Sequence, residues 1–515
     1  MISTKQNIIT VLYLIGIGGL LISLPFSNFL MSFFEFFILG TWILELDFKN
    51  KIKSFVTNKP ALILTSLYIL HIAGLLWTSD FNYALNDLRI KLPLLMMPVV
   101  LSTGPKIEEK IFNKLLVLFV IAVSAATLIC TKIYLFDEYN DIREISIFIS
   151  HIRFALLICF SIFILLHFIF VNKSFSKTWK IIFSILGLWL LIFIYILNSL
   201  TGISVLIITG ISVLLYFGFK SHKKNIKIIC YLASFSIILF VIAYVHFVSK
   251  DFSIKKPINF NNLEKYTAAG NPYVHDTSSY YYENGNLVYI YVNYDELREA
   301  WNKRSRLNFD SADAKGNQVK DILIRYLTSK GLRKDAEGVS SLDSCDIKAI
   351  EKGITNYLLL NKIPFKQRIY QIIWEYQNYS NTGNPSGHSV MQRIEYCRVA
   401  CNIIKDNFFI GVGTGDLQKE FNNYYDISNS QLDKKWRLRA HNQYLTMFVA
   451  FGVFGFCWFI FTLLYPAIKL KKFNDYFFFV FFVIVALSML SEDTLETQAG
   501  VTFFAFFYSF LLFNR

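Results

Sequence analysis

Residues 388–456 decide the fold, and they read HSVMQRIEYCRVACNIIKDNFFIGVGTGDLQKEFNNYYDISNSQLDKKWRLRAHNQYLTMFVAFGVFGF. The stretch begins as a polar, helix-like run that carries Arg393 and Arg398, and it continues through a glycine-rich turn and a basic segment. At His441 it runs straight into an apolar segment. Cations placed where water meets lipid suit a phosphate-bearing lipid. This junction is therefore the first candidate for a functional site.

The composition of the whole chain is typical of a membrane protein. Of the 515 residues, 54% are hydrophobic and 17% are aromatic. The net charge of +14 has a simple explanation in a membrane protein, because cytoplasmic loops carry excess lysine. No basic-aromatic module stands out, so we expect no nucleic-acid partner. The seven cysteines are scattered and show neither a disulfide framework nor a metal-ligand spacing.

About twelve apolar segments approach or reach the roughly 17–25 residues that a helix needs to cross a bilayer. The fourth segment is short and is interrupted by Pro93 and Pro98, which makes it the least regular. The segments are residues 8–26, 29–46, 60–77, 88–103, 112–135, 151–171, 178–198, 200–219, 226–248, 442–468, 474–491 and 497–513.

Lysines in every second loop orient these segments. The loops after the second, fourth, sixth, eighth and tenth segments are lysine-rich, whereas the loops around residues 137–144 and 492–496 are acidic. Because cytoplasmic loops carry the excess of lysine, both termini are predicted to be cytoplasmic. The chain then divides into transmembrane helices 1–9 (residues 1–248), an outer, periplasmic region (249–440) and helices 10–12 (441–515).

The outer region is about the size of a small domain. Residues 277–294 predict a hairpin with its turn at Asn284-Gly285-Asn286. Helical patterns follow at residues 295–305, 317–331, 343–360, 365–378 and 389–407. The predicted fold class is an all-α polytopic membrane protein with a large mixed α/β region between helices nine and ten.

His441 is the candidate catalytic base. It stands at the outer mouth of the tenth segment beside Asn442, where a neutral imidazole could take a proton from an attacking hydroxyl. The alternative is an interfacial histidine that caps the helix or lies solvated among lipid headgroups.

Five arginines are candidates for binding a diphosphate, because a guanidinium fork matches phosphate oxygens. Arg393 and Arg398 are five residues apart, which turns their side chains about 140° from each other on a helix. Each of them could instead form an ordinary ion pair. Arg153 lies in the first turn of the sixth segment, where a charge is costly unless it snorkels or has a function. Arg437 and Arg439 complete the set.

The glycines of this stretch are explained by backbone structure and do not indicate a binding site. The turn at Gly411-Val-Gly-Thr-Gly lacks the spacing of a dinucleotide-binding loop and is expected to end a helix. Gly452 and Gly455 are expected to allow close helix packing inside the membrane.

Together these motifs resemble the O-antigen ligase and O-antigen polymerase superfamily of bacterial envelope enzymes. Gln392-Arg393 with the later run Ile404–Gly413 is similar to the family's arginine, helix and "dhPllGvG" turn. The run from His441-Asn-Gln-Tyr-Leu to Phe451-Gly-Val-Phe-Gly455 is similar to the family's "HNxYL…GxxG". The arrangement of about twelve helices with one large periplasmic region is also similar and is GT-C-like.

The resemblance implies a glycosyltransferase of the bacterial inner membrane. Its donor would be a glycan on undecaprenyl diphosphate, and no metal or cofactor is implied because the leaving group is already activated. The acceptor would be a lipid A-core sugar in a ligase, which ranks first, another lipid-linked glycan in a polymerase, or a protein Ser or Thr in a third branch. His441 would be the base, Arg393 would bind diphosphate, Arg153 would assist, and Arg398 would be a less direct helper.

One departure from the family pattern and two rival functions remain. The family often has an arginine where the seventh and eighth helices meet, whereas this chain reads Ser199-Leu-Thr-Gly202, so a second cation would come from the other arginines.

A transporter or flippase of lipid-linked sugars would have cations through the depth of the membrane. A membrane-anchored sensor would have an outer domain that folds alone.

Overall fold

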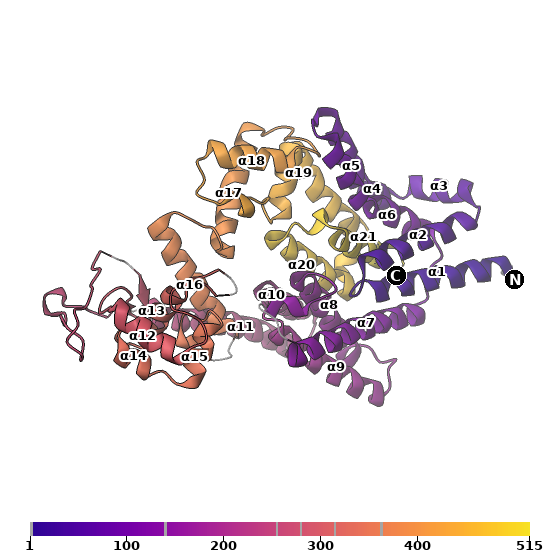
Figure 1. The fold of residues 1–515 in the computed structure, drawn as a ribbon. Helices are drawn as coiled ribbons and strands as arrows, with labels where there is room; N and C mark the ends of the chain where they lie inside the picture. The colour runs from indigo at the N-terminus through magenta and orange to yellow at the C-terminus, as the bar shows by residue number, and fades with distance from the viewer. Residues whose placement is uncertain are drawn as a thin grey trace. The chain divides into compact units, whose positions relative to one another are not determined.

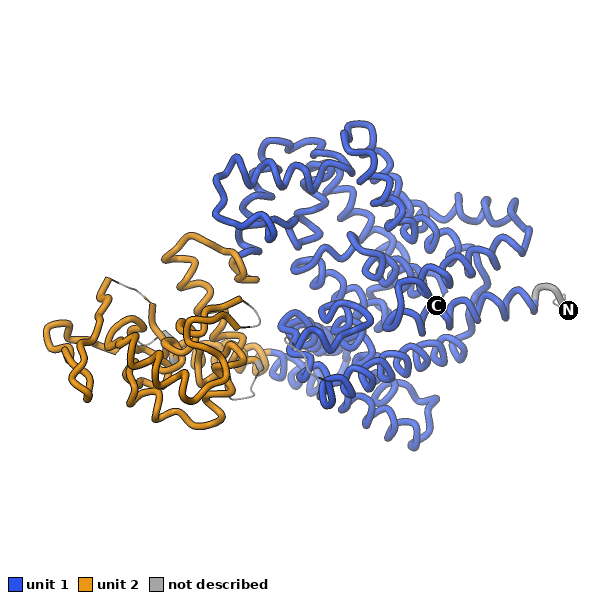
Figure 2. Tube along the Cα trace, in the orientation of Figure 1, with its two compact units in different colours: residues 1–234, 392–515 blue, residues 235–391 orange. Residues whose placement is uncertain are grey.

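The computed structural model describes residues 4–137, 142–253, 256–278, 281–313, 316–360 and 364–514, which fold mainly into α-helices (Figure 1). The chain divides into two compact units (Figure 2). Unit 1 comprises residues 1–234 and 392–515, and unit 2 comprises residues 235–391. Residues 392–440, which the sequence assigned to the outer region, thus belong to the same compact unit as most of the apolar helices.

The twelve apolar segments correspond to helices or broken helices. Seven of the described helices are long and apolar enough to cross a membrane, or up to eight if the bent pair α2–α3 forms one span. The helical membrane class is therefore supported, and the count of twelve stays a prediction. The helices are α1 (Thr4–Ser23), α2 (Asn28–Leu44), α3 (Phe48–Thr57), α4 (Lys59–Ala73), α5 (Phe81–Lys91), α6 (Pro93–Thr103), α7 (Glu109–Phe136), α8 (His151–Phe170), α9 (Lys177–Ile196), α10 (Leu200–Lys220), α11 (Lys224–Ser253), α19 (Gln443–Lys469), α20 (Tyr476–Ser491) and α21 (Gln498–Phe513).

Local chemistry sets several of these boundaries. The fourth apolar segment is broken between α5 and α6 because Pro93, which has no N–H to donate, starts the second helix. Elsewhere a polar side chain accepts a backbone N–H of the first helical turn and so fixes the start of the helix. Such caps are Ser27, Asp80, Ser150, Ser176, Ser199 and Asn442.

Aromatic rings from four helices fill the core of unit 1. The Phe160 ring of α8 lies 5.0 Å from Phe507 of α21 and 5.7 Å from Phe481 of α20. Phe119 of α7 lies 5.1 Å from Phe507. These edge-to-face contacts favour one arrangement of the rings. They join these four helices, and residues of the α20–α21 connection line the same small pocket as Arg153 at the start of α8.

The tenth apolar segment is broken at Gly452. This residue has φ +61° and ψ −167°, a conformation that glycine adopts far more easily than other residues. A Cβ on Gly452 would lie 2.3 Å from the carbonyl carbon of Phe409. A Cβ on Gly411, whose φ is +68°, would lie 2.4 Å from the carbonyl carbon of Ala450. The expectation of ordinary helix packing at Gly452 is therefore wrong, because the residue opens the helix to the glycine-rich turn.

Backbone hydrogen bonds join the broken helix to this turn. The break removes intrahelical partners from two carbonyl groups of α19, and the turn replaces them. Gly411 follows α17 (Ser389–Asp406), which confirms the predicted helix-ending turn. The bonds run from Val412 N–H to Val449 O (2.9 Å), from Gly413 N–H to Ala450 O (2.9 Å) and from Val453 N–H to Phe408 O (2.8 Å).

Unit 2 is mainly helical in its described part. Its hairpin, β1 (Tyr282–Glu283) and β2 (Asn286–Leu287), confirms the predicted turn, although each strand has two residues. Residues 279–280 of the predicted hairpin lie outside the described residues, as do Glu138 and Asp141 of the acidic loop. Trp301 and Leu323 are fully buried in the core of unit 2. The helices are α12 (Tyr294–Arg304), α13 (Val319–Ser329), α14 (Ala336–Ser340), α15 (Ser344–Glu351) and α16 (Pro364–Thr382).

Candidate functional site

His441 lies immediately before the cap of α19. Asn442 Oδ1 accepts the Leu445 N–H at 3.1 Å, which starts the helix at Gln443 and leaves His441 outside the first turn. The His441 backbone has φ +47°, an uncommon region for a non-glycine residue that is associated with functional positions. The half-buried imidazole packs on the Tyr396 ring of α17, with the ring centres 5.6 Å apart.

The surroundings of His441 favour the neutral form of its imidazole. Burial lowers the pKa of His441, and nearby arginines lower it further against the opposing effect of Asp493. A neutral imidazole can accept a proton from a hydroxyl at neutral pH. The arginines are Arg393, Arg439 and Arg153, so three of the five predicted arginines lie within electrostatic range of His441.

Arg393 of α17 is paired with an acidic residue of the α20–α21 connection. Its Nη2 lies 3.1 Å from Glu492 Oε1, and its side chain is 37% exposed. Burial raises the pKa of Glu492, whereas Arg393 and Arg153 lower it. Glu492 thus interacts with two of the predicted cations. An anion that binds Arg393 would compete with this carboxylate.

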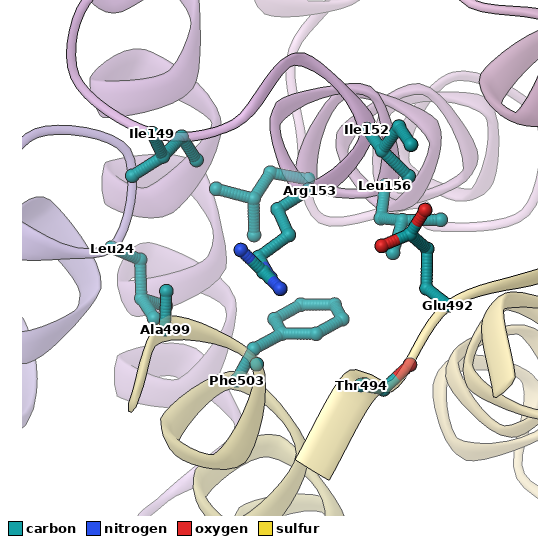
Figure 3. Close-up of a pocket in the computed structure, with 11 residues that line it drawn as sticks. Leu24, Ile149, Ile152, Arg153, Leu156, Glu492, Thr494, Ala499 and Phe503 are labelled. Carbon is teal, nitrogen blue, oxygen red and sulfur yellow. The ribbon is translucent and has the colours of Figure 1, made fainter. Parts of the chain in front are cut away.

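Arg153 reaches from the first turn of α8 into a small apolar pocket of unit 1, toward the ring of Phe503 (Figure 3). The cavity holds about 20 Å³, which is roughly the space of one water molecule. Ser150 Oγ accepts a long hydrogen bond from Arg153 Nη1 at 3.4 Å. A guanidinium in such apolar surroundings is expensive and marks a functional candidate. The other lining residues are Leu24, Ile149, Ile152, Leu156, Leu157, Glu492, Thr494, Ala499 and Gly500.

Arg439 belongs to a buried network around Glu496. Its Nη1 lies 2.9 Å from Glu496 Oε2, and Lys91 Nζ lies 3.0 Å from the same oxygen. Gln443 donates to the other carboxylate oxygen at 3.1 Å. Burial alone would raise the pKa of Glu496, but Lys91 and Arg439 hold it below its ordinary value. The network fixes the backbone on both sides of His441.

The two remaining arginines are engaged elsewhere. Arg398 donates to Glu395 on the same helix from Nε (2.9 Å) and Nη2 (2.6 Å). Ser430 donates to the same carboxylate at 2.5 Å. Arg437 Nη1 lies 2.5 Å from Asp426 Oδ1 at the end of α18 (Leu417–Ile427). These contacts hold the loop before His441 in place, and a role of either arginine in diphosphate binding stays a prediction.

Three acidic residues of the α20–α21 connection complete the candidate site, although the sequence pattern indicated only that this loop is acidic and external. Glu492 pairs with Arg393, and Glu496 pairs with Arg439. Asp493 accepts a hydrogen bond from Thr446 of α19 at 2.7 Å. The signal that could have identified them is three carboxylates within five residues of a short loop between two apolar helices.

Residues 355–460 match the family model described as O-antigen ligase. The matched range contains Arg393, the glycine-rich turn and His441, whereas Arg153 and the acidic loop lie outside it. No curated protein matches the chain. The match supports the superfamily that the sequence motifs indicated.

Proposed function

From the O-antigen ligase domain at residues 355–460, we propose that this chain is a glycosyltransferase that transfers a glycan from undecaprenyl diphosphate to a hydroxyl of a lipid A-core sugar. The reaction would take place at the periplasmic face of the inner membrane. The observation that carries the proposal is the position of His441, with Arg153, Arg393 and Asp493 in electrostatic range, at the start of α19.

Each residue near His441 has a distinct part in the proposed reaction. The neutral imidazole takes the proton of the acceptor hydroxyl as its oxygen forms a bond to the anomeric carbon of the donor glycan. The bond between that carbon and the diphosphate oxygen breaks, and the diphosphate leaves with the bonding electrons. Arg393 and Arg153 stabilise the negative charge of the leaving diphosphate. The proton on His441 then passes to solvent.

Glu492 holds Arg393 until the donor arrives. A diphosphate presents more negative charge than one carboxylate, so it would take over the guanidinium that Glu492 now holds at 3.1 Å. The released carboxylate would stay close to Arg153, with which it also interacts. This exchange would keep both arginines oriented between turnovers.

Complementation tests the proposal and separates the related acceptors. The chain would be expressed in a strain that lacks its O-antigen ligase and in one that lacks its O-antigen polymerase, and the lipopolysaccharide ladder would be read on a gel. A ligase restores capped core in the first strain. Restored chain length in the second strain alone would identify a polymerase, and glycan on protein Ser or Thr would identify the third branch.

Two substitutions and two matched controls make the same experiment specific for the site. His441→Ala and Arg393→Ala are expected to remove complementation at unchanged expression. His222→Ala and Arg306→Ala alter exposed residues remote from His441 in the sequence and are expected to complement normally. Normal complementation by His441→Ala would disprove the proposed base.

A further inference from the structure

A polar pocket in unit 2 lies outside the O-antigen ligase domain. It holds about 310 Å³, which is at the lower end of the roughly 300–1,000 Å³ of small-molecule sites. Its walls come from the segment after α11, from the hairpin with the turn that follows it, and from the end of α13 with the residues after it. They are Lys256, Pro257, Ile258, Asn259, Asn262, Gly285, Asn286, Leu287, Ile290, Tyr291, Thr328, Gly331, Leu332, Arg333 and Lys334.

Lys334, one of the residues that line this pocket, is a buried basic residue. Its side chain is 3% exposed, and its ammonium makes no ion pair or hydrogen bond with any residue that the structure describes. Asp335, the adjacent carboxylate, instead accepts the Tyr273 hydroxyl and, at 2.7 Å, the Gly338 N–H. Burial and, to a lesser extent, Arg333 lower the pKa of Lys334 to about 7, against the opposing effect of Asp335. A buried cation of this kind is costly unless an anion joins it.

The backbone beside Lys334 is held rigidly. Lys334 N–H donates to Tyr291 O at 3.0 Å, and Asn293 N–H donates to Lys334 O at 2.8 Å. Tyr291 has φ +56°, a strained conformation for an aromatic residue that persists only where surrounding contacts impose it. The Arg333 guanidinium lies 3.5 Å from the Tyr291 ring centre. Strain maintained at the wall of a pocket is typical of a preformed binding site.

The other wall residues suit a sugar. Asn259, Asn262 and Asn286 bring side-chain amides, which both donate and accept hydrogen bonds as sugar hydroxyls do. Asn286 uses Nδ2 on Thr328 O at 3.0 Å, which leaves its carbonyl oxygen for a ligand hydroxyl. Aliphatic side chains such as Leu287 provide contact for the apolar face of a sugar ring.

We propose that this pocket of unit 2 binds an acidic saccharide, whose carboxylate or phosphate pairs with the Lys334 ammonium while its hydroxyls meet the asparagine amides. The binding itself does not depend on the proposed function. Its place in the reaction does: if the chain transfers glycans, the pocket would recognise an acidic sugar of the acceptor or of the donor glycan.

Ligand-observed NMR on the full chain in detergent tests the binding. The probes are glucuronate, glucose 6-phosphate, glucose and inorganic phosphate, each measured by saturation transfer without any lipid donor. Glucuronate, glucose 6-phosphate or both are expected to bind about tenfold more tightly than glucose, because an ion pair in a partly buried site is worth about one decade. If glucuronate binds more tightly, the natural ligand carries a carboxylate. If glucose 6-phosphate binds more tightly, it carries a phosphate.

Variants locate the binding. Lys334→Met keeps the length of the side chain, removes its charge and is expected to abolish the preference for the acidic probes. Lys348→Met changes an exposed lysine of α15 and should leave the preference unchanged. Arg393→Ala should also leave it unchanged, and this separates the pocket from the proposed diphosphate site.

The proposal is overturned if the acidic probes bind no better than glucose, or if Lys334→Met retains their preference. If inorganic phosphate binds as tightly as the acidic sugars, the pocket binds anions without recognising the sugar, and the proposal of a saccharide site is also overturned. Because the lipid donor is absent, failure of the transferase proposal in complementation leaves these outcomes unaffected.

Discussion

Arg393 Nη2 and Glu492 Oε1 lie 3.1 Å apart and connect α17 to the loop between α20 and α21, across 99 positions of sequence. The pair brings Arg393 to an acidic loop that lies outside both family motifs, the arginine, helix and turn motif and the motif that begins at His441. It also puts a carboxylate where the proposed mechanism needs a phosphate. Glu492 is therefore the residue whose substitution discriminates best between a structural ion pair and a binding site.

Glu492→Gln is expected to lower the KM for the lipid donor severalfold, because the amide competes less for Arg393 than a carboxylate does. The measurement is initial transfer rate against donor concentration. Asp310→Asn is the matched control, since Asp310 also pairs with an arginine, Arg298, but belongs to unit 2. An unchanged or raised KM in Glu492→Gln would argue for a purely structural pair.

His441→Ala is expected to reduce kcat by about 100-fold or more, the usual contribution of a general base. The donor KM should change little, because the arginines remain. A purified-enzyme transfer assay separates the two parameters. An increase in KM with an unchanged kcat would assign His441 to substrate binding instead.

Asp493→Asn is expected to move the acid limb of the pH–rate profile to lower pH. The base works when neutral, so activity falls as pH falls through the pKa of His441, which burial already holds below its ordinary value of about 6.5. Asp493 opposes that lowering, and its removal lowers the pKa further. The asparagine keeps an oxygen to accept from Thr446. A limb that stays in place or moves to higher pH would contradict the assignment of the limb to His441.

Gly452→Ala is expected to destabilise unit 1 by about 1–3 kcal/mol or more, because its φ is positive and its Cβ would meet the Phe409 backbone at 2.3 Å. Gly210→Ala is the matched control: its Cβ would meet no heavy atom within 4 Å, and alanine favours a helix by up to about 1 kcal/mol. Thermal unfolding of the two variants in the same detergent compares them. Equal melting temperatures would contradict the helix break.

Lys334→Met is expected to raise the thermal stability at neutral pH and to flatten its pH dependence. Burial and, to a lesser extent, Arg333 lower the pKa of Lys334 from 10.5 to about 7, so between these pH values the unfolded chain binds more protons. The stability contributed by this group therefore rises with pH in that window, and each pKa unit corresponds to about 1.4 kcal/mol. The difference between variant and wild type should shrink from pH 7 to pH 10.

Other ionisable groups lie in the same part of unit 2, so the quantity compared is the difference in stability between variant and wild type at each pH. A difference that does not vary with pH would show that Lys334 is not a buried cation. The groups are Lys256, Glu264, Tyr273, His275, Arg333 and Asp335.

Much of the fold follows from local patterns in the sequence. The apolar runs located the helices, and Pro93 located the break between α5 and α6. The spacing of Arg393 and Arg398 indicated that they face different ways, and they bind different acids in the structure. These features depend on neighbours a few residues apart.

The remaining features depend on contacts between distant parts of the chain. Lys91 and Glu496 are 405 positions apart, and Ser79 donates to Asp416 across 337 positions. No periodicity encodes such a pair. The break at Gly452 was missed for the same reason. An apolar run with two glycines has the same sequence pattern whether the glycines pack against another helix or make room for a loop.

The hydrogen bonds that place residues 408–413 in the break of α19 have a consequence for engineering and for evolution. The helix that carries Arg393 and the helix that follows His441 are joined by main-chain contacts that accept only glycine at Gly411 and Gly452. Recombination between relatives that exchanges one helix without the other would separate paired carbonyl and amide groups. The smallest segment that can be transplanted as a working block is therefore residues 389–456, together with the acidic loop that it meets.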